Sequence, residues 1–94
     1  MDKVTLDGLV EQLKAMPSDK DRQRLLRNGL DNFTVSASIA SQLVSLFHMS
    51  DAIVAAAVLV YPLVEDKDNF EAEVLAKFKF EEERAEVREK VGMY

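Results

Sequence analysis

The sequence predicts an all-α domain of about six short helices that form three stacked helical hairpins. Three observations lead to this fold class: apolar residues recur at helical spacing, charged residues avoid the central third of the chain, and the predicted helix starts recur at a nearly constant interval. Strand signals are absent, because the one β-like run, residues 57–61, lies in a longer segment whose alanines favour helix.

Capping and breaking residues divide the first third of the chain into two helices. Thr5 caps the first helix, whose apolar residues recur at helical spacing, and Pro17 ends it. Ser18 caps the second helix, which carries acidic residues in its first turn. That helix runs to Gly29, a residue suited to a left-handed C-terminal turn.

The central third of the chain predicts a buried hairpin. Asp51 is the one formal charge between Phe33 and Val64, and all other Asp, Glu, Lys and Arg residues lie in the two flanks. A segment so poor in charge must be covered by those flanks. Thr34 caps its first helix, and Ser50 with Asp51 opens a second helix that is apolar all round.

The longest apolar run, from Ala52 to Leu63 with Tyr61 and Pro62 inside it, is about a dozen residues long, which is short of the roughly 20 that a transmembrane helix needs. It therefore predicts a buried helix and no membrane span. A membrane hairpin over residues 33–64 is the alternative. The polar side chains of its first arm disfavour it, and these are Ser36, Ser38, Ser41, Gln42, Ser45, His48 and Asp51.

Two further helices are predicted after Pro62. Asp68 and Glu71 form a capping pair at the start of the fifth helix. Phe80 begins the sixth helix, whose first turn is acidic and whose last turn is basic, the arrangement that the helix dipole favours. Gly92 ends this helix.

The spacing of these signals predicts internal repetition. Helix starts at Ser18, Ser50 and Glu81 lie 32 and 31 residues apart. We therefore expect one domain over residues 1–94 that is built from stacked helix pairs, with an irregular six-helix bundle as the open alternative. The approximate repeats are residues 5–29, 34–62 and 68–92.

The second half of the chain carries a series of short motifs. They are SQLVSLF at residues 41–47, Ser50-Asp51, LVYP at residues 59–62, Asp68-Asn69-Phe70 and KFKF at residues 77–80. Together they resemble a family of small helical repeat domains of unknown function that are appended to larger proteins. In that family an apolar helix ending in Phe, a Ser-Asp turn and a helix ending in Leu-x-Tyr alternate with an Asn-Phe pair.

The resemblance covers mainly residues 41–91. It departs in the third unit, where Glu81-Glu82 replaces the Ser-Asp turn, and in the first unit, where Met16-Pro17 replaces the aromatic residue. Because these motifs are caps and core positions, the resemblance implies a fold and no activity.

Residues that commonly catalyse reactions or bind metals are few. His48, Ser50 and Asp51 lie close together, but Ser50 and Asp51 are accounted for as a helix cap and a first-turn acid, and such near neighbours along a loop seldom meet at one reacting atom. One histidine without cysteines does not make a structural zinc site. The acidic residues between positions 65 and 73 miss the spacing of a calcium loop. We expect no enzymatic activity, no metal and no cofactor.

The composition favours protein partners. A net charge of −5 predicts repulsion from nucleic acids and from anionic membranes. The chain has no cysteine, and its first residues lack the basic and apolar regions of a signal peptide. These features favour a cytoplasmic location and leave the compartment open.

Two helix faces are candidates for partner binding. On the second helix, Lys20, Arg24 and Arg27 form an outward basic stripe that suits an acidic partner segment, while the stem of Arg22 packs inward and its guanidinium reaches the edge or pairs with a carboxylate. On the third helix an uncharged polar face either packs lightly inside the domain or docks another chain, including a second copy in a homodimer. That face consists of Ser38, Ser41, Gln42 and Ser45.

These features together predict a non-catalytic protein–protein interaction module that binds a peptide or helix in a groove between helical hairpins. One alternative is a structural role in which the module self-associates or spaces larger pieces. A second alternative is a bundle that encloses an apolar small molecule. Its pocket residues are Phe47, Ile53, Val54, Val58 and Leu59.

Overall fold

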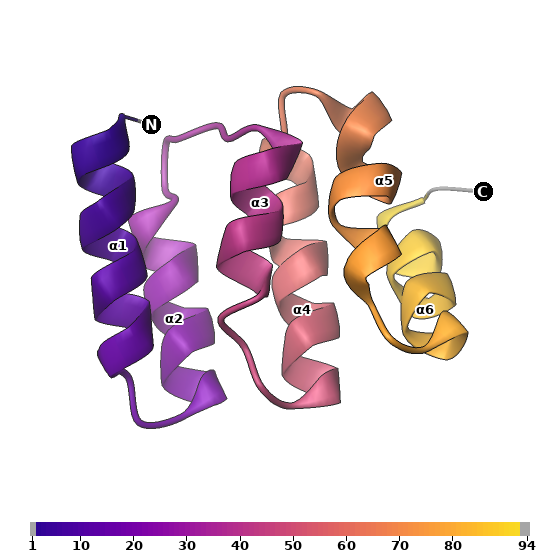
Figure 1. Ribbon diagram of the computed structural model, residues 1–94, viewed down its shortest axis with the longest axis horizontal. Helices are drawn as coiled ribbons and strands as arrows, with labels where there is room; N and C mark the ends of the chain where they lie inside the picture. The colour runs from indigo at the N-terminus through magenta and orange to yellow at the C-terminus, as the bar shows by residue number, and fades with distance from the viewer. Residues whose placement is uncertain (1, 93–94) are drawn as a thin grey trace.

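The computed structural model of the protein describes residues 2–92. These residues contain six α-helices and three short 3₁₀ turns. The α-helices are α1 (Lys3–Ala15), α2 (Asp19–Gly29), α3 (Ala37–Val44), α4 (Ser50–Val60), α5 (Phe70–Glu73) and α6 (Glu81–Val91). The 3₁₀ turns are Tyr61–Leu63, Lys67–Asn69 and Leu75–Lys77. Figure 1 shows α1, α3 and α5 in one layer and α2, α4 and α6 behind them, so that three helical hairpins stand side by side. The predicted all-α fold of stacked hairpins is confirmed.

The second hairpin (α3–α4) lies between the first (α1–α2) and the third (α5–α6). Its rear helix α4 contacts α2 on one side and α6 on the other (Figure 1). Val54, Ala56, Ala57 and Val60 of α4 are buried as a result. Coverage from both sides explains why the central third of the chain carries one formal charge.

The hydrophobic core runs through all three hairpins, because every α-helix contributes buried apolar side chains. Phe70 of α5 is fully buried and meets the ring of Tyr61 edge to face, with the ring centroids 4.9 Å apart. The fully buried leucines are Leu13, Leu26, Leu43 and Leu75, and Leu30 is 1% exposed. The hairpins are therefore held together chiefly by continuous apolar packing.

The segments that lead into the second and third hairpins pair with each other through backbone hydrogen bonds. The N–H of Val35 donates to the carbonyl of Leu63 at 2.9 Å, and the N–H of Glu65 donates to the carbonyl of Val35 at 2.8 Å. The Asp66 carboxylate then accepts from the N–H of Ala37 at 2.7 Å, at the start of α3. This pairing fixes the spacing between the two hairpins.

Two predicted helix caps in the first half of the chain are wrong. The N-cap of α1 is Asp2, whose carboxylate accepts from the N–H of Thr5 at 2.8 Å. The N-cap of α3 is Ser36, not Thr34. The hydroxyl of Thr34 donates instead to Glu65, and the neighbouring backbone pairing keeps this segment extended. Tertiary contacts thus move the start of α3 by two residues. The predicted cap at Ser50 is wrong as well, because the N-cap of α4 is Met49 without a side-chain cap hydrogen bond, and the Ser50 hydroxyl donates to Glu83.

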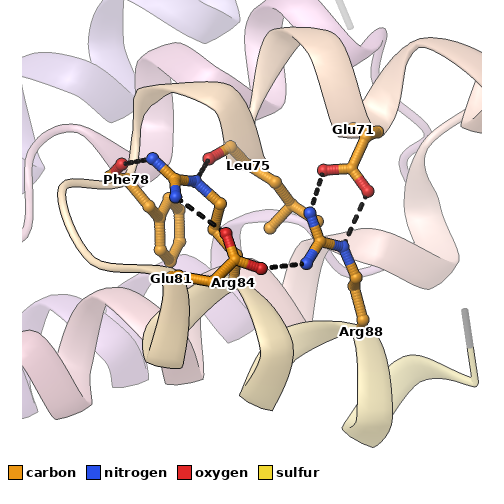
Figure 2. A network of polar contacts seen from close by, with 6 residues as sticks. All are labelled: Glu71, Leu75, Phe78, Glu81, Arg84 and Arg88. Carbon is orange, nitrogen blue, oxygen red and sulfur yellow. Dashed lines mark hydrogen bonds and ion pairs between the residues drawn. The ribbon is translucent and has the colours of Figure 1, made fainter.

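The predicted capping pair of Asp68 and Glu71 is also wrong. The α5 helix is a single turn that follows a 3₁₀ turn, and its N-cap, Asn69, makes no side-chain cap hydrogen bond. Glu71 instead forms an ion pair with Arg88 of α6 at 2.8 Å (Figure 2). Its carboxylate therefore joins the two helices of the third hairpin.

The caps at Ser18 and Gly92 are as predicted, whereas Gly29 has a different role. Ser18 accepts from the N–H of Asp21, and Gly92 has the left-handed conformation with a φ of 83°. Gly29 lies within α2, where an added Cβ atom would come within 2.8 Å of a methyl carbon of Leu9. An added side chain there would therefore force the Leu9 side chain to shift, because α1 and α2 approach closely.

Arg22 closes the turn of the first hairpin. Its Nε donates to the carbonyl of Leu13 at 3.1 Å, its Nη2 donates to the carbonyl of Met16 at 2.8 Å, and its Nη1 pairs with Asp19 at 2.7 Å. The residue is 9% exposed. The inward stem and the carboxylate pairing expected for Arg22 are both observed, and its guanidinium serves the fold.

Arg84 makes the same set of contacts in the third hairpin. Its Nε donates to the carbonyl of Leu75 at 3.0 Å, its Nη2 donates to the carbonyl of Phe78, and its Nη1 pairs with Glu81 at 3.0 Å (Figure 2). In both hairpins the acceptors lie nine, six and three residues before the arginine. We call Arg22 and Arg84 the turn arginines.

Asp19 joins the first hairpin to the second. Besides pairing with Arg22, its carboxylate accepts from the backbone N–H of His48 at 3.1 Å and from that of Met49 at 2.7 Å. Burial by itself raises the pKa of the Asp19 carboxyl, but the hydrogen bonds from Met49, Arg22 and His48 outweigh burial and hold the pKa below its usual value. The native state therefore stabilises the ionised form of Asp19.

We predict that Asp19→Asn lowers the free energy of unfolding at pH 7 by about 2 kcal/mol, because hydrogen bonds to a charged group are lost. A lowered native pKa stabilises the fold above the unfolded-state pKa of about 3.9, and the stabilisation disappears as the pH falls through the native pKa. Urea unfolding should therefore show a smaller difference between wild type and variant at pH 3 than at pH 7. Asp31→Asn, at an exposed position, is the control with no expected effect. An equal difference at both pH values would contradict this assignment.

Candidate functional site

A cavity of about 390 Å³ lies between the second and third hairpins, at the end where their helices turn. Its walls come from α3, from the start of α4 and from the segment that connects α5 to α6. The apolar lining residues are Val44, Phe47, Ile53, Val74, Phe78 and Phe80, and the polar ones are Ser41, Ser45, His48, Ser50, Lys77, Lys79 and Glu83. We call this space the junction cavity.

The backbone of the three hairpin turns is alike, which allows the two junctions between hairpins to be compared. The first junction lies between the first and second hairpins, and the second junction lies between the second and third hairpins. The N–H groups of Met16, Phe47 and Phe78 each donate to the carbonyl three residues earlier, at 3.2, 3.2 and 3.0 Å. These three residues lie 31 positions apart. Residues separated by 31 positions therefore occupy equivalent places around neighbouring turns.

The comparison explains why a cavity is found at the second junction. At four equivalent places, residues that are large or charged at the first junction are replaced by residues that are smaller or that extend into solvent. The pairs, first junction and then second, are Val10 and Ser41, Asp19 and Ser50, Arg22 and Ile53, and Leu46 and Lys77. The replacements at residues 41, 50 and 53 reduce the side-chain volume at the second junction, where the cavity lies.

Ser50 and His48 both line the cavity, but their polar contacts are with different residues. The hydroxyl of Ser50 donates to the carboxylate of Glu83, which comes from α6 of the next hairpin. His48 is exposed, and its backbone N–H is bound by Asp19 of the first hairpin. The side chains of Ser50 and His48 are thus not arranged as a nucleophile and its base.

The structure divides the residues predicted on the third helix. Ser41 and Ser45 line the junction cavity, Ser41 being buried and Ser45 exposed at its rim. Ser38 is exposed and lies outside the cavity. The polar face of this helix therefore forms part of one cavity wall, which sequence analysis could not distinguish from light internal packing.

The residues predicted on the second helix lie elsewhere. Lys20, Arg24 and Arg27 are exposed on α2 and do not line the junction cavity. Arg22, proposed with them, is buried and donates to three acceptors within its own hairpin. It is therefore not available to a partner.

Sequence analysis missed the wall that the third hairpin contributes. Lys77, Lys79 and the rings of Phe78 and Phe80 line the cavity, and Phe80 is 58% exposed. A comparison of residues 31 positions apart contains the signal, since Lys77 stands where the first junction has Leu46. Only the structure shows that these places face one another.

Within residues 2–92 no α-helix combines the length and the apolar character that crossing a membrane requires. The family described as "Domain of unknown function (DUF4476)" matches residues 1–91. This match confirms the resemblance seen in the second half of the chain and extends it over the first hairpin. No curated protein and no solved structure matches the chain.

We predict that Ser41→Val combined with Lys77→Leu, which copies Val10 and Leu46 of the first junction, raises the free energy of unfolding by about 1–2 kcal/mol. Apolar side chains would then fill part of the junction cavity and bury additional surface. Differential scanning calorimetry should show a higher Tm than for wild type. Ser38→Val, outside the cavity, should leave Tm nearly unchanged. A lower Tm for the double variant would contradict this account of the cavity.

Proposed function

We propose a function for this chain, which belongs to the DUF4476 family of domains of unknown function, on the basis of the junction cavity. The protein is a non-catalytic interaction module, and a peptide or helix of a protein partner binds in the groove between its second and third hairpins. The observation that carries this proposal is a cavity of about 390 Å³ with walls from two hairpins.

The lining of the cavity supports a peptide ligand. Apolar side chains such as Val44, Ile53 and Val74 offer a surface for an apolar anchor residue, while serines and lysines at the rim offer hydrogen bonds and charge. Phe80 in the lining is 58% exposed, and Met49, which lies outside the lining between His48 and Ser50, is 64% exposed. A partner segment that leaves the cavity would therefore meet further apolar surface.

The contacts of Ser50 and His48 support a binding role in preference to catalysis. Both residues line the cavity, yet the Ser50 hydroxyl donates to the carboxylate of Glu83, and within residues 2–92 no hydrogen bond joins Ser50 to His48. The proposal also treats the three hairpins as repeats of one unit, which is supported by the shared contacts of the two turn arginines. In this view the binding site lies at the junction of two units.

The basic stripe of α2 supports a second contact with the partner. Lys20, Arg24 and Arg27 are exposed, as a surface for an acidic partner segment requires. Because the stripe does not contribute to the cavity lining, such a contact would add to cavity binding and would not replace it.

Two other functions make different predictions for the same cavity. An apolar small molecule is supported by the presence of Phe47 and Ile53 in the lining, and native mass spectrometry of the purified domain would reveal it as added mass. Self-association as a structural module would give a molecular mass that rises with concentration in sedimentation equilibrium. If blocking the cavity abolished the added mass, the ligand of the cavity would be a small molecule and not a peptide. If it abolished the self-association, the ligand would be a second copy of the chain.

We predict that peptides selected from a random 12-residue phage-displayed library bind wild type and lose at least tenfold in affinity for Ser45→Trp. The introduced indole covers the cavity rim at an exposed position, so folding should be retained. Isothermal titration calorimetry with synthetic peptides measures the loss.

Ser38→Trp is the matched control, because it places the same indole on an exposed serine of α3 outside the cavity. It should bind the selected peptides as wild type does. Equal affinity of all three proteins, or no selection of any peptide, would overturn the proposed function.

A further inference from the structure

The second hairpin keeps the backbone acceptors of a turn arginine but has isoleucine in the arginine's place. Ile53 lies 31 residues after Arg22 and 31 residues before Arg84. The carbonyls equivalent to those that bind the two turn arginines belong to Val44 and Phe47. Val44, Phe47 and Ile53 all line the junction cavity.

These two carbonyls retain hydrogen-bonding capacity. The carbonyl of Val44 accepts from the N–H of Phe47 at 3.2 Å, as the equivalent carbonyls of Leu13 and Leu75 do while they also accept from an arginine. The carbonyl of Phe47 accepts no hydrogen bond from any residue between 2 and 92. An isoleucine side chain ends where the stem of an arginine would continue toward its guanidinium. Because Val44, Phe47 and Ile53 all line the cavity, the position equivalent to that guanidinium falls within the cavity.

A carboxylate is also present, although it comes from a different residue. The turn arginines pair with acidic residues three positions earlier, where the second hairpin has Ser50. Glu83 of the third hairpin lines the same cavity, and its carboxylate contacts the Ser50 hydroxyl. The residues that line the cavity therefore include two whose backbone carbonyls, and one whose carboxylate, correspond to the acceptors of both turn arginines.

Acidic residues beside the cavity favour a cationic ligand, whereas the lining itself contains two lysines and one glutamate. Acidic side chains line the adjoining groove between α4 and α6, and the protein has a net charge of −5. The acidic residues of this groove are Asp51, Glu82, Glu83 and Glu86. Lys77 and Lys79 oppose a cation, but both side chains are exposed and can turn toward solvent or toward carboxylates of the partner.

We propose that the junction cavity binds the guanidinium of an arginine from the partner peptide, in the manner in which Arg22 and Arg84 are bound within the protein. The carbonyls of Val44 and Phe47 accept from its Nε and Nη groups, and Glu83 supplies the opposite charge. The aromatic rings in the lining add faces on which a guanidinium plane stacks. This inference rests on the proposed function and names the residue that anchors the peptide.

The acceptor set is tested first within the protein itself. Ile53→Arg supplies the side chain in cis, and we expect it to raise Tm by about 4–8 °C. Ile53→Lys carries the same charge without the planar fork, and we expect a lower Tm than for wild type. A lower Tm for Ile53→Arg, or failure of this variant to fold, would overturn the proposal.

The partner arginine is tested with the peptides selected against wild type. We expect an arginine in these peptides whose replacement by lysine, or by the neutral isostere citrulline, lowers affinity at least tenfold. Ile53→Arg should lower affinity for the parent peptide at least tenfold as well, because its own guanidinium occupies the acceptors. Glu83→Gln should weaken binding several-fold more than Glu82→Gln, which alters a neighbour outside the cavity lining.

The possible results separate this inference from the function on which it rests. Peptides that bind wild type, lose affinity for Ser45→Trp and tolerate replacement of every arginine would overturn the inference and leave the proposed function intact. Equal binding of the lysine peptide would overturn a guanidinium site. Absence of any selected peptide would overturn both, and self-association that Ser45→Trp abolishes would replace the peptide by a second copy of the chain.

Discussion

Backbone carbonyls at the end of a helix need hydrogen-bond donors, and this requirement organises the turns of the terminal hairpins. Arg22 and Arg84 meet it by donating to two turn carbonyls and to an acidic residue of the following helix. Each arginine thereby holds the second helix of its hairpin against the first. Asp19, oriented by Arg22, reaches the next turn and joins two hairpins through its carboxylate. These few charged groups fix the turns and one contact between hairpins, while the continuous apolar core holds the stack together.

The second hairpin does without a turn arginine because of its position in the stack. Its helix α4 is packed by α2 on one side and by α6 on the other, whereas each terminal hairpin has one neighbour. Burial from both sides stabilises the second hairpin without the hydrogen bonds of a turn arginine. The replacement of Arg22 by Ile53 and of Asp19 by Ser50 at the equivalent places is therefore tolerated, and it opens the cavity from which we infer function.

Local signals predicted the order of the helices, and contacts between distant residues account for the wrong cap of α3 and for the role of Glu71, whereas the missed cap of α1 is a local contact of Asp2. Ser18 and Gly92 act within one helix end, and both were predicted correctly. Thr34 failed as a cap because it binds Glu65, far along the chain. Of the candidate site, Ser41 and Ser45 were among the predicted partner-binding residues, while the lining from the third hairpin was not, because nothing near it in the sequence marks a cavity wall.

The sequence by itself determined the all-α class, the interval of about 31 residues between hairpins and the burial of the central third. These properties follow from apolar periodicity, capping residues and the distribution of charge, which act over one or two helical turns. Only the tertiary structure decided that Arg22 is bound internally and that the second junction is hollow. A cavity is a difference in side-chain volume across elements that are distant along the chain, so it exists only once the hairpins are packed together.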